Sequence, residues 1–335
     1  MTDDNLAIIR IFFPHAAREM VRVREKQRRF VHYTSADTGL KILRSERMLL
    51  RNSTLMNDFS EIRHGWDCLL HAYNGPLGTR LQNALRIVQP DLPEILHDNF
   101  NGQIMDVMNE TYLMSVSEHG DPNADKRGDE HEDAFGRLSM WRAYAPKDGV
   151  AFVLNHDPFL CESNALRAFT SPVVYALPED FQPAFEELVT AVESNIHQLA
   201  DLGGQYVHDT LINAFRFAVQ STKHPSFKEE REWRVIYSPS LLSKEGALTE
   251  RQLERVPTEI VSLGGVPQRI FAIPFVDYPE EGFRGATPAA LINRVLIGPS
   301  QDSYAIRQAF IGELMRLNVP DAASNVVITG VPLRH

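Results

Sequence analysis

Two glutamates lie two residues apart where an apolar stretch begins. Glu230 and Glu232 flank Arg231, and residues 233–237 read Trp-Arg-Val-Ile-Tyr. Side chains two apart on an extended chain lie on the same face, so the sequence predicts two carboxylates side by side. Such like charges repel, which favours a use for one of them, such as stabilising a developing positive charge or accepting a proton. The alternative is a solvated strand end in which Arg231 and Arg234 screen the acids.

A candidate partner for this pair is a histidine in another short apolar stretch. His32 lies in the run Phe-Val-His-Tyr-Thr at 30–34. A histidine in a strand is commonly a satisfied core residue, yet its imidazole can also exchange a proton near neutral pH. Further polar clusters interrupt apolar segments at predicted element ends, where sites on rigid scaffolds usually lie. They are residues 51–61, 115–117 together with 140–145, and 230–234.

Composition and charge set the broad class of the protein. Of the 335 residues, 43% are hydrophobic and 23% are charged, which is typical of a soluble globular chain. The formal net charge of -10 argues against a surface built mainly for nucleic acid. Arg18 to Arg29 nevertheless form a basic stretch on a predicted helix, which is either its solvated face or a contact surface for a nucleic-acid or protein acceptor. No apolar run approaches a membrane span, and the acidic N-terminus is unlike a secretory signal, so we expect a cytoplasmic protein without membrane contact.

The order of helical and strand-like patterns predicts one α+β domain at 30–335, preceded by a basic helical region at 1–29 and carrying a helical insertion at about 178–222. The polar stretch 118–133 is predicted to be a loop. Strands are predicted at 30–34, 48–51, 111–117, 149–154, 232–237, 270–275, 293–297 and 325–329.

Several common sites lack their sequence motifs. The chain contains no GxGxxG or Walker pattern, which argues against a Rossmann or P-loop nucleotide site. It contains no HExxH and no GxSxG, so metal-dependent and serine hydrolysis lose their usual support. The two cysteines have no metal-ligand spacing, and we predict no metal site.

An ordered series of motifs resembles a widespread bacterial domain family of unknown function. The resemblance spans roughly residues 30 to 330. The motifs are HYTS at 32–35, LRNS at 50–53, NDFSE at 57–61, MWRAYA at 140–145 with GVAF at 149–152, EREWR at 230–234 and IGP at 297–299.

A second resemblance suggests chemistry. A His-Tyr-Thr strand, a Ser-x-Ser pattern and a late Glu-x-Glu before an apolar strand are similar to NAD-dependent ADP-ribosyltransferases. Residues 115–117 fit the middle pattern, and the interval to Glu230 requires a large insertion. The resemblance implies a split antiparallel or mixed sheet with flanking helices, NAD as substrate, and transferase or glycohydrolase activity, as in some toxins and antiviral defence effectors.

The same resemblance implies roles for individual residues. Glu232 would stabilise the ribosyl cation, while Glu230 would orient the acceptor or take its proton. Their proximity is expected to raise the pKa of one of the two, the direction that a general base requires. His32 would bind a ribose hydroxyl or the nicotinamide amide. The residues expected to contact NAD are Tyr33, Thr34, Arg51, Asn57, Asp58, Ser117, Trp141, Tyr144 and Arg234.

Two other functions stay open at this point. The same residues could form a module that binds a nucleotide without turning it over, and a nuclease could use the acidic clusters with a divalent metal. Trp141 and Tyr144, three apart on a predicted helix, suit a hydrophobic core as well as a stacking platform.

Overall fold

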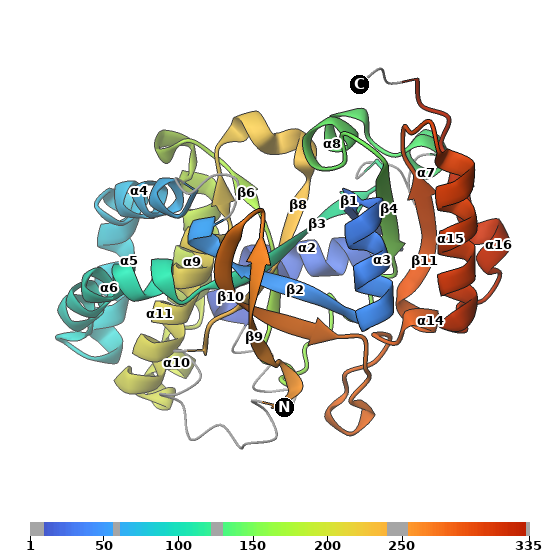
Figure 1. Cartoon of the computed structure of the whole chain (residues 1–335). Coiled ribbons are helices and arrows are strands. Elements are labelled where there is room, and N and C mark those ends of the chain that lie inside the picture. The colour runs from blue at the N-terminus through green and yellow to red at the C-terminus, as the bar shows by residue number, and fades with distance from the viewer. Residues whose placement is uncertain (1–9, 56–60, 122–129, 240–253, 333–335) are drawn as a thin grey trace.

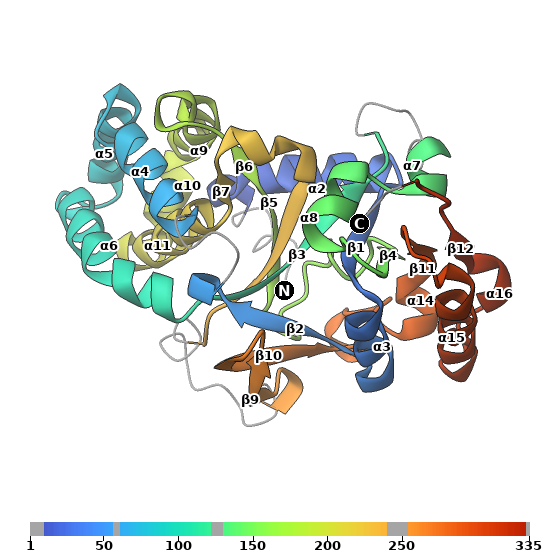
Figure 2. The same cartoon turned by 45° about the horizontal axis from the view of Figure 1, so that its top comes forward.

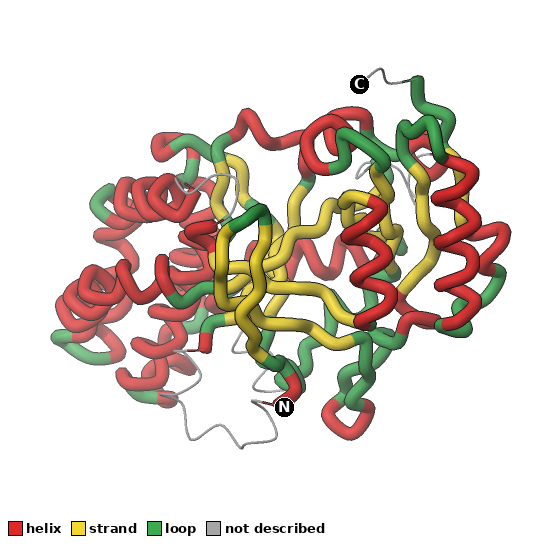
Figure 3. The backbone as a smooth tube through the Cα atoms, viewed as in Figure 1, coloured by secondary structure: helices red, strands yellow, loops and turns green. Residues whose placement is uncertain are grey.

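The computed structural model describes residues 10–55, 61–121, 130–239 and 254–332, in which a mixed sheet is flanked by helices (Figure 1, Figure 3). This architecture confirms the predicted mixture of sheet and flanking helices. The ten strands of the main sheet are β1 (Arg29–Ser35), β2 (Arg47–Asn52), β3 (Tyr112–His119), β4 (Gly149–Leu154), β5 (Phe169–Pro172), β8 (Glu232–Tyr237), β9 (Thr258–Leu263), β10 (Val266–Pro274), β11 (Ile292–Ile297) and β12 (Val326–Ile328). A second, parallel pair is formed by β6 (Val174–Tyr175) and β7 (Thr222–Lys223).

Helices connect these strands and cover the sheet. The α-helices are α2 (Pro14–Glu25), α3 (Ala36–Ser45), α4 (Glu61–Tyr73), α5 (Pro76–Val88), α6 (Leu92–Asn109), α7 (Glu130–Phe135), α8 (Leu138–Tyr144), α9 (Gln182–Ser194), α10 (Ile196–Leu202), α11 (Gly204–Gln220), α14 (Pro288–Leu291), α15 (Ser303–Arg316) and α16 (Ala322–Asn325). The 3-10 turns are η1 (Ser53–Leu55), η2 (Pro178–Asp180), η3 (Pro225–Glu230) and η4 (Pro279–Glu281). No described helix is both long and apolar enough to cross a membrane.

The main sheet forks at strand β3. One edge of β3 pairs with β8 over residues 112–117. The opposite edge pairs with β2 at Tyr112 and Leu113, and with β1 from Ser117 to His119. Residues 114–116 therefore face neither β1 nor β2 on that edge. Strands β1 and β2 diverge from this point, and the fork carries β4, β11 and β12 on one arm and β10 and β9 on the other.

Strand alternation separates an apolar and a polar face near the fork. Tyr112, Met114 and Val116 point into the main core, where their partners on β8 and the β4 residue Phe152 also lie. Helices α3 and α15 cover this core on the β4 side. On the opposite face, Ser115 and Ser117 alternate with those residues, and their β8 partners are Arg234 and Glu232. The register thus brings the serines and the charged β8 residues onto one face.

The helices α4, α5, α6, α9, α10 and α11 form a lobe with its own hydrophobic core (Figure 1, Figure 2). This core contains residues of all six helices, such as Leu69, Leu85 and Phe215, and lies apart from the core beneath the sheet. The predicted insertion at about 178–222 corresponds to α9–α11. It packs against the earlier segment 61–109, so the lobe is assembled from two stretches of chain that are distant in sequence.

Two sequence predictions need correction. The basic helix does not run through Arg29, because α2 ends at Glu25 and Arg29 already belongs to β1. The stretch 118–133 is not all loop: β3 extends to His119, and α7 begins at Glu130. The strands β5 and β9 were not predicted, and β9 has an alternating half-exposed pattern with few large apolar residues pointing inward.

Gly65 lets α4 lie against α11. A Cβ at this position would come within 2.1 Å of the carbonyl oxygen of Val219, a backbone atom that cannot move aside alone. We expect Gly65→Ala to lower the free energy of unfolding by about 1–3 kcal/mol, measured by urea denaturation. Gly102→Ala on α6 is the matched control, because a Cβ there meets nothing within 4 Å and alanine favours helix. Equal stability of the two variants would contradict this close approach.

Candidate functional site

Five charged side chains form a buried cluster where the helical lobe meets the sheet. Glu61 opens α4, Lys223 ends β7, Glu230 ends η3, and Glu232 and Arg234 lie on β8. Between 2% and 13% of each side chain is exposed. Charged groups are rarely buried to this extent unless they are paired, and each of the five has an oppositely charged partner within 3.2 Å.

Lys223 holds the three carboxylates together. Its Nζ lies 2.9 Å from Glu61 Oε1, 2.7 Å from Glu230 Oε2 and 3.2 Å from Glu232 Oε2. A lysine ammonium has three donors, so these contacts use its full hydrogen-bonding capacity. The Lys223 side chain also lies over the ring of Phe227, 4.6 Å from its centroid.

Arg234 fixes Glu232 from the same strand. Its Nε lies 2.8 Å from Glu232 Oε1 and its Nη2 lies 3.1 Å from Glu232 Oε2. The same Nη2 lies 2.5 Å from Glu61 Oε2, and Nη1 donates to the carbonyl of Gln220 at 2.6 Å. The planar guanidinium therefore joins β8 to the start of α4 and the end of α11.

Hydroxyl groups complete the cluster. Ser115 Oγ donates to Glu232 Oε1 at 2.5 Å, and Tyr144 Oη donates to Glu230 Oε1 at 2.6 Å. Ser117 Oγ donates to the carbonyl of Glu230 at 2.5 Å. The oxygen of Tyr175 accepts from the amide of Glu232 at 2.7 Å. Both carboxylates from the Glu-x-Glu motif are thus held in fixed directions.

The two glutamates do not meet in the way that the sequence predicted. Glu230 ends a 3-10 turn, Arg231 has a positive φ of 45°, and the strand begins only at Glu232. The backbone from Glu230 to Glu232 is therefore not extended, and alternation along a strand does not place the two side chains on one face. A left-handed residue between them and the ammonium of Lys223 bring the carboxylates together.

The electrostatics of the cluster favour the charged forms of Glu232 and Lys223. Burial alone would raise the pKa of Glu232, but Arg234 and Lys223 outweigh it and lower that pKa to about 2. Burial opposes the charge of Lys223, yet Glu232 and Glu61 raise its pKa. Glu232 is therefore ionised at neutral pH, and the raised pKa expected for one of the two glutamates is not that of Glu232. Burial and the neighbouring Glu230 raise the pKa of Tyr144, so its hydroxyl stays protonated and donates.

His32 lies at the fork of the sheet. Its Nδ1 is 3.0 Å from the carbonyl oxygen of Ser115, in the part of β3 that β1 and β2 leave unpaired. Since a carbonyl only accepts, Nδ1 carries the proton and Nε2 is an acceptor in the neutral ring. Burial lowers the pKa of His32, which favours that neutral form. By strand alternation its side chain lies on the face of its β4 partner Phe152, opposite to Glu232, and Ser115 contacts both residues.

Four of the other predicted site residues lie away from the carboxylates. Trp141 is fully buried, packs edge-on against Tyr33 at 4.8 Å and donates through its Nε1 to the carbonyl of Phe135, so it is a core residue and not an exposed stacking platform. Tyr33 accepts from the amide of Arg137, and burial raises its pKa to about 12. Thr34 is buried on β1.

Arg51 lies on the β2 arm of the fork. It contacts Gln268 and the carbonyl of Leu55, not the cluster. Asn57 and Asp58 lie outside the described residues.

Most arginines of the basic stretch from Arg18 to Arg29 form contacts within the protein. Arg22 forms a two-pronged ion pair with Glu118, and Arg29 pairs with Asp133. Arg28 is fully buried. Arg18 pairs with Glu187 on α9. These contacts reduce the basic surface available to an acidic partner.

Sequence reasoning missed Glu61 as a charged group, Lys223, Tyr175 and the role of Ser115. Glu61 was noted as the last residue of the NDFSE motif, and Lys223 follows a helical stretch without any motif. A weak signal existed for Ser115, which is two residues before Ser117 in the Ser-x-Ser pattern. Only the pairing of β3 with β8 shows that it contacts Glu232.

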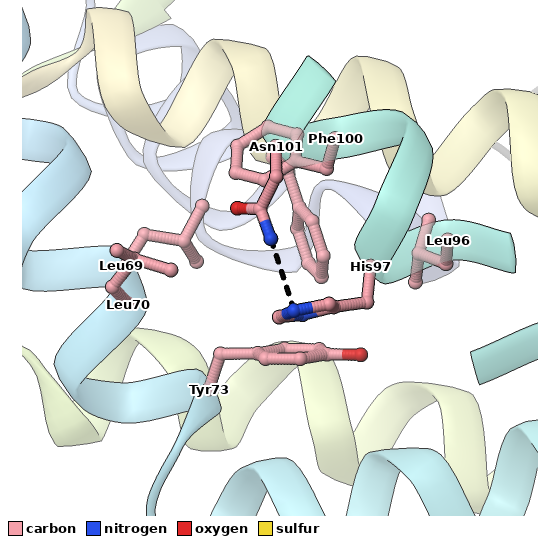
Figure 4. A pocket seen from close by; sticks show the side chains of 8 residues that line it. Leu69, Leu70, Tyr73, Leu96, His97, Phe100 and Asn101 are labelled. Carbon is pink, nitrogen blue, oxygen red and sulfur yellow. Dashed lines mark hydrogen bonds between the residues drawn. The ribbon is translucent and has the colours of Figure 1, made fainter. Parts of the chain in front are cut away.

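Two other features of the described residues lack the properties of a metal or nucleotide site. Among them, no group of three or more histidine, cysteine, aspartate or glutamate side chains is arranged to hold a metal ion. A cavity in the helical lobe lies between Tyr73, His97 and Phe100, where Asn101 Nδ2 donates to His97 Nε2 at 2.9 Å (Figure 4). Its volume of about 10 Å³ holds no more than one water molecule, far below the size of a nucleotide site.

Comparison with known families finds one match. Residues 140–235 match a family described as "Protein of unknown function (DUF2971)". This confirms the predicted resemblance to a family of unknown function for the part of the chain that holds the MWRAYA and EREWR motifs. Neither the curated proteins nor the solved structures contain a match to the chain. The match includes Tyr144, Lys223 and both glutamates of the Glu-x-Glu motif.

The lowered pKa of Glu232 predicts a pH-dependent stability. Because the pKa in the folded state lies below the ordinary 4.5, this carboxylate stabilises the fold above about pH 4.5, and the contribution is lost as pH falls toward 2. We expect wild type to exceed Glu232→Gln by about 3 kcal/mol at pH 7, and the difference to shrink across that range in urea denaturation. Glu186→Gln, at a side chain 57% exposed, serves as the control. A difference that is independent of pH would contradict the assignment.

Proposed function

We propose that the protein is an NAD-consuming enzyme of ADP-ribosyltransferase type, either a transferase or a glycohydrolase, with its reaction centre at the carboxylate cluster. One observation carries the proposal. The neighbouring strands β1 and β3 hold the His-Tyr-Thr and Ser-x-Ser motifs, and the Glu-x-Glu motif that the resemblance links to them ends at the first residue of β8. Ser115 joins them, since its carbonyl accepts from His32 and its hydroxyl donates to Glu232.

The charges of the cluster suit cleavage of the nicotinamide–ribose bond. Three carboxylates, Glu61, Glu230 and Glu232, face two cations, Lys223 and Arg234, which leaves one negative charge in excess. Bond cleavage creates an oxocarbenium-like centre on the ribose. A fixed carboxylate beside that centre stabilises charge that exists mainly in the transition state.

We assign the stabilising role to Glu230, in place of the Glu232 favoured from sequence. Glu232 has Arg234, Lys223 and Ser115 on its carboxylate and only 6% of its side chain is exposed. Glu230 has 13% of its side chain exposed and contacts one cation, Lys223, and one neutral donor, Tyr144. Glu232 then orders the cations, and Glu230 faces the ligand.

His32 and Tyr144 fit supporting roles. His32 lies on the opposite face of the sheet from Glu232, and it supports the site by holding the carbonyl of Ser115, whose hydroxyl donates to Glu232. Tyr144 is partly exposed and aims its hydroxyl at Glu230, which orients that carboxylate. We leave the acceptor unassigned, because the internal ion pairs of Arg22 and Arg29 weaken the case for a nucleic acid bound along α2. A toxin or defence role stays a prediction.

A module that binds a nucleotide without turnover is the second candidate. The observation that favours it is the mutual neutralisation of Glu232 and Arg234, a pairing typical of a rigid scaffold. Incubating the pure protein with NAD and measuring free nicotinamide by chromatography separates the two functions. Binding of NAD, measured by calorimetry, without release of nicotinamide supports the module. A protein that neither binds NAD nor releases nicotinamide contradicts both functions.

A substitution at Glu230 tests the assigned carboxylate. We expect Glu230→Gln to lower nicotinamide release by about 100-fold or more while the melting temperature changes by only a few degrees, because glutamine can still accept from Tyr144 and Lys223. Glu229→Gln is the matched control, since Glu229 is the exposed neighbouring residue, and it should behave as wild type. Activity that survives Glu230→Gln but is lost in Glu232→Gln, with the fold intact, would return the role to Glu232.

A further inference from the structure

The backbone that carries Glu230 is held by a side chain from outside the cluster. Arg137 Nη1 donates to the carbonyls of Glu229 at 2.8 Å and Glu230 at 3.2 Å. Ser117 Oγ donates to the same Glu230 carbonyl. These bonds fix the end of η3, just before the left-handed residue Arg231. The direction of the Glu230 side chain follows from this backbone.

Arg137 is itself anchored on a second buried carboxylate. Its Nη2 donates to the carbonyl of Glu118 at 2.8 Å and lies 2.5 Å from Glu132 Oε1. The other oxygen of Glu132 lies 3.3 Å from Arg231 Nη1. Glu132 is 8% exposed, so both of its oxygens are occupied by arginines in a largely water-free place. One carboxylate thus binds both Arg137, which precedes α8, and Arg231, which lies between η3 and β8.

The same residue fixes the partner of Glu230. Arg137 immediately precedes α8, and its amide donates to Tyr33 Oη at 2.8 Å. Its carbonyl accepts from the amides of Met140 and Trp141 and so begins the helix. Tyr144, which donates to Glu230, is the last residue of α8. Both ends of the Tyr144–Glu230 hydrogen bond are therefore connected to Arg137.

We propose that Arg137, held by Glu132, is the positioning residue that sets Glu230 against Tyr144. Arg137 contacts the backbone carbonyl of Glu230 and not its carboxylate, so it acts through the backbone and through α8. The effect of Arg137 on catalysis rests on the proposed function. Its effect on the Tyr144–Glu230 hydrogen bond can be measured in the absence of turnover. Arg137 donates to four acceptors that lie in different directions, three backbone carbonyls and one carboxylate. Only the planar guanidinium has enough fixed donors to reach all four, so lysine cannot replace it.

The first test reads the geometry directly. In protein labelled with ¹³C at the tyrosine Cζ, the Tyr144 resonance is assigned by its loss in Tyr144→Phe. We expect Arg137→Lys to shift this resonance and to let Tyr144 begin to ionise at a lower pH, because Glu230 no longer holds its proton. Arg142→Lys is the control on the same helix, since Arg142 is exposed, and its spectrum should match wild type.

The second test reads catalysis. We expect Arg137→Lys to lower kcat for nicotinamide release by about 10- to 100-fold with little change in KM, because the carboxylate is displaced and the rest of the ligand site is not. Glu132→Gln should lower kcat in the same direction but less, since the amide can still accept from Arg137. Should Arg137→Lys not fold, Glu132→Gln serves for both measurements.

The two tests separate the proposals. A Tyr144 resonance that shifts in Arg137→Lys, when the wild type releases no nicotinamide, would support the positioning role and contradict the proposed function. An unchanged Tyr144 resonance in folded Arg137→Lys would overturn the positioning role, whatever the activity of wild type. Active wild type with an unchanged kcat in Arg137→Lys would overturn it as well.

Discussion

The burial of Arg234 is the constraint on which the site depends. A guanidinium placed almost wholly out of water costs several kcal/mol unless its donors are satisfied. Here the donors reach Glu232 on the same strand, Glu61 at the start of α4 and the carbonyl of Gln220 at the end of α11. The Arg234 side chain therefore requires α4 to begin, and α11 to end, at fixed places beside the sheet. The charged cluster lies between the two hydrophobic cores because it joins them.

The fork at β3 is the second constraint. A continuous sheet would pair every edge group of β3, but β1 and β2 diverge and leave residues 114–116 without a strand on that edge. An unpaired buried carbonyl is costly, and His32 satisfies the one at Ser115. This explains a histidine among apolar residues on β1 without reference to catalysis. The same bond holds the part of β3 whose Ser115 hydroxyl donates to Glu232, so His32 contributes to the site through the strand between them.

The sequence predicted the elements better than the contacts between them. Apolar runs were sufficient to predict β1, β4 and β8, and the helices of 178–222 were recognised from their period. The cluster could not be predicted, because Glu61 and Arg234 are 173 residues apart and meet only when the lobe docks on the sheet. The geometry of Glu230 and Glu232 was wrong for a local reason. A non-glycine residue with positive φ, here Arg231, is uncommon, and nothing in the motif indicates it.

The imbalance of charge in the cluster is the strongest argument that it does more than hold the fold together. A buried ion-pair network that serves stability alone gains most when its charges cancel, since every uncompensated charge retains its desolvation cost. Glu232 and Arg234 meet this condition, and Glu61 shares both cations. Glu230 adds a further carboxylate on the side where Tyr144 is partly exposed. Its backbone is fixed by Arg137 and its side chain by Tyr144 and Lys223, so the excess charge is held in one place and one direction. A carboxylate that is costly to bury and yet rigidly oriented is what stabilisation of a cationic transition state requires.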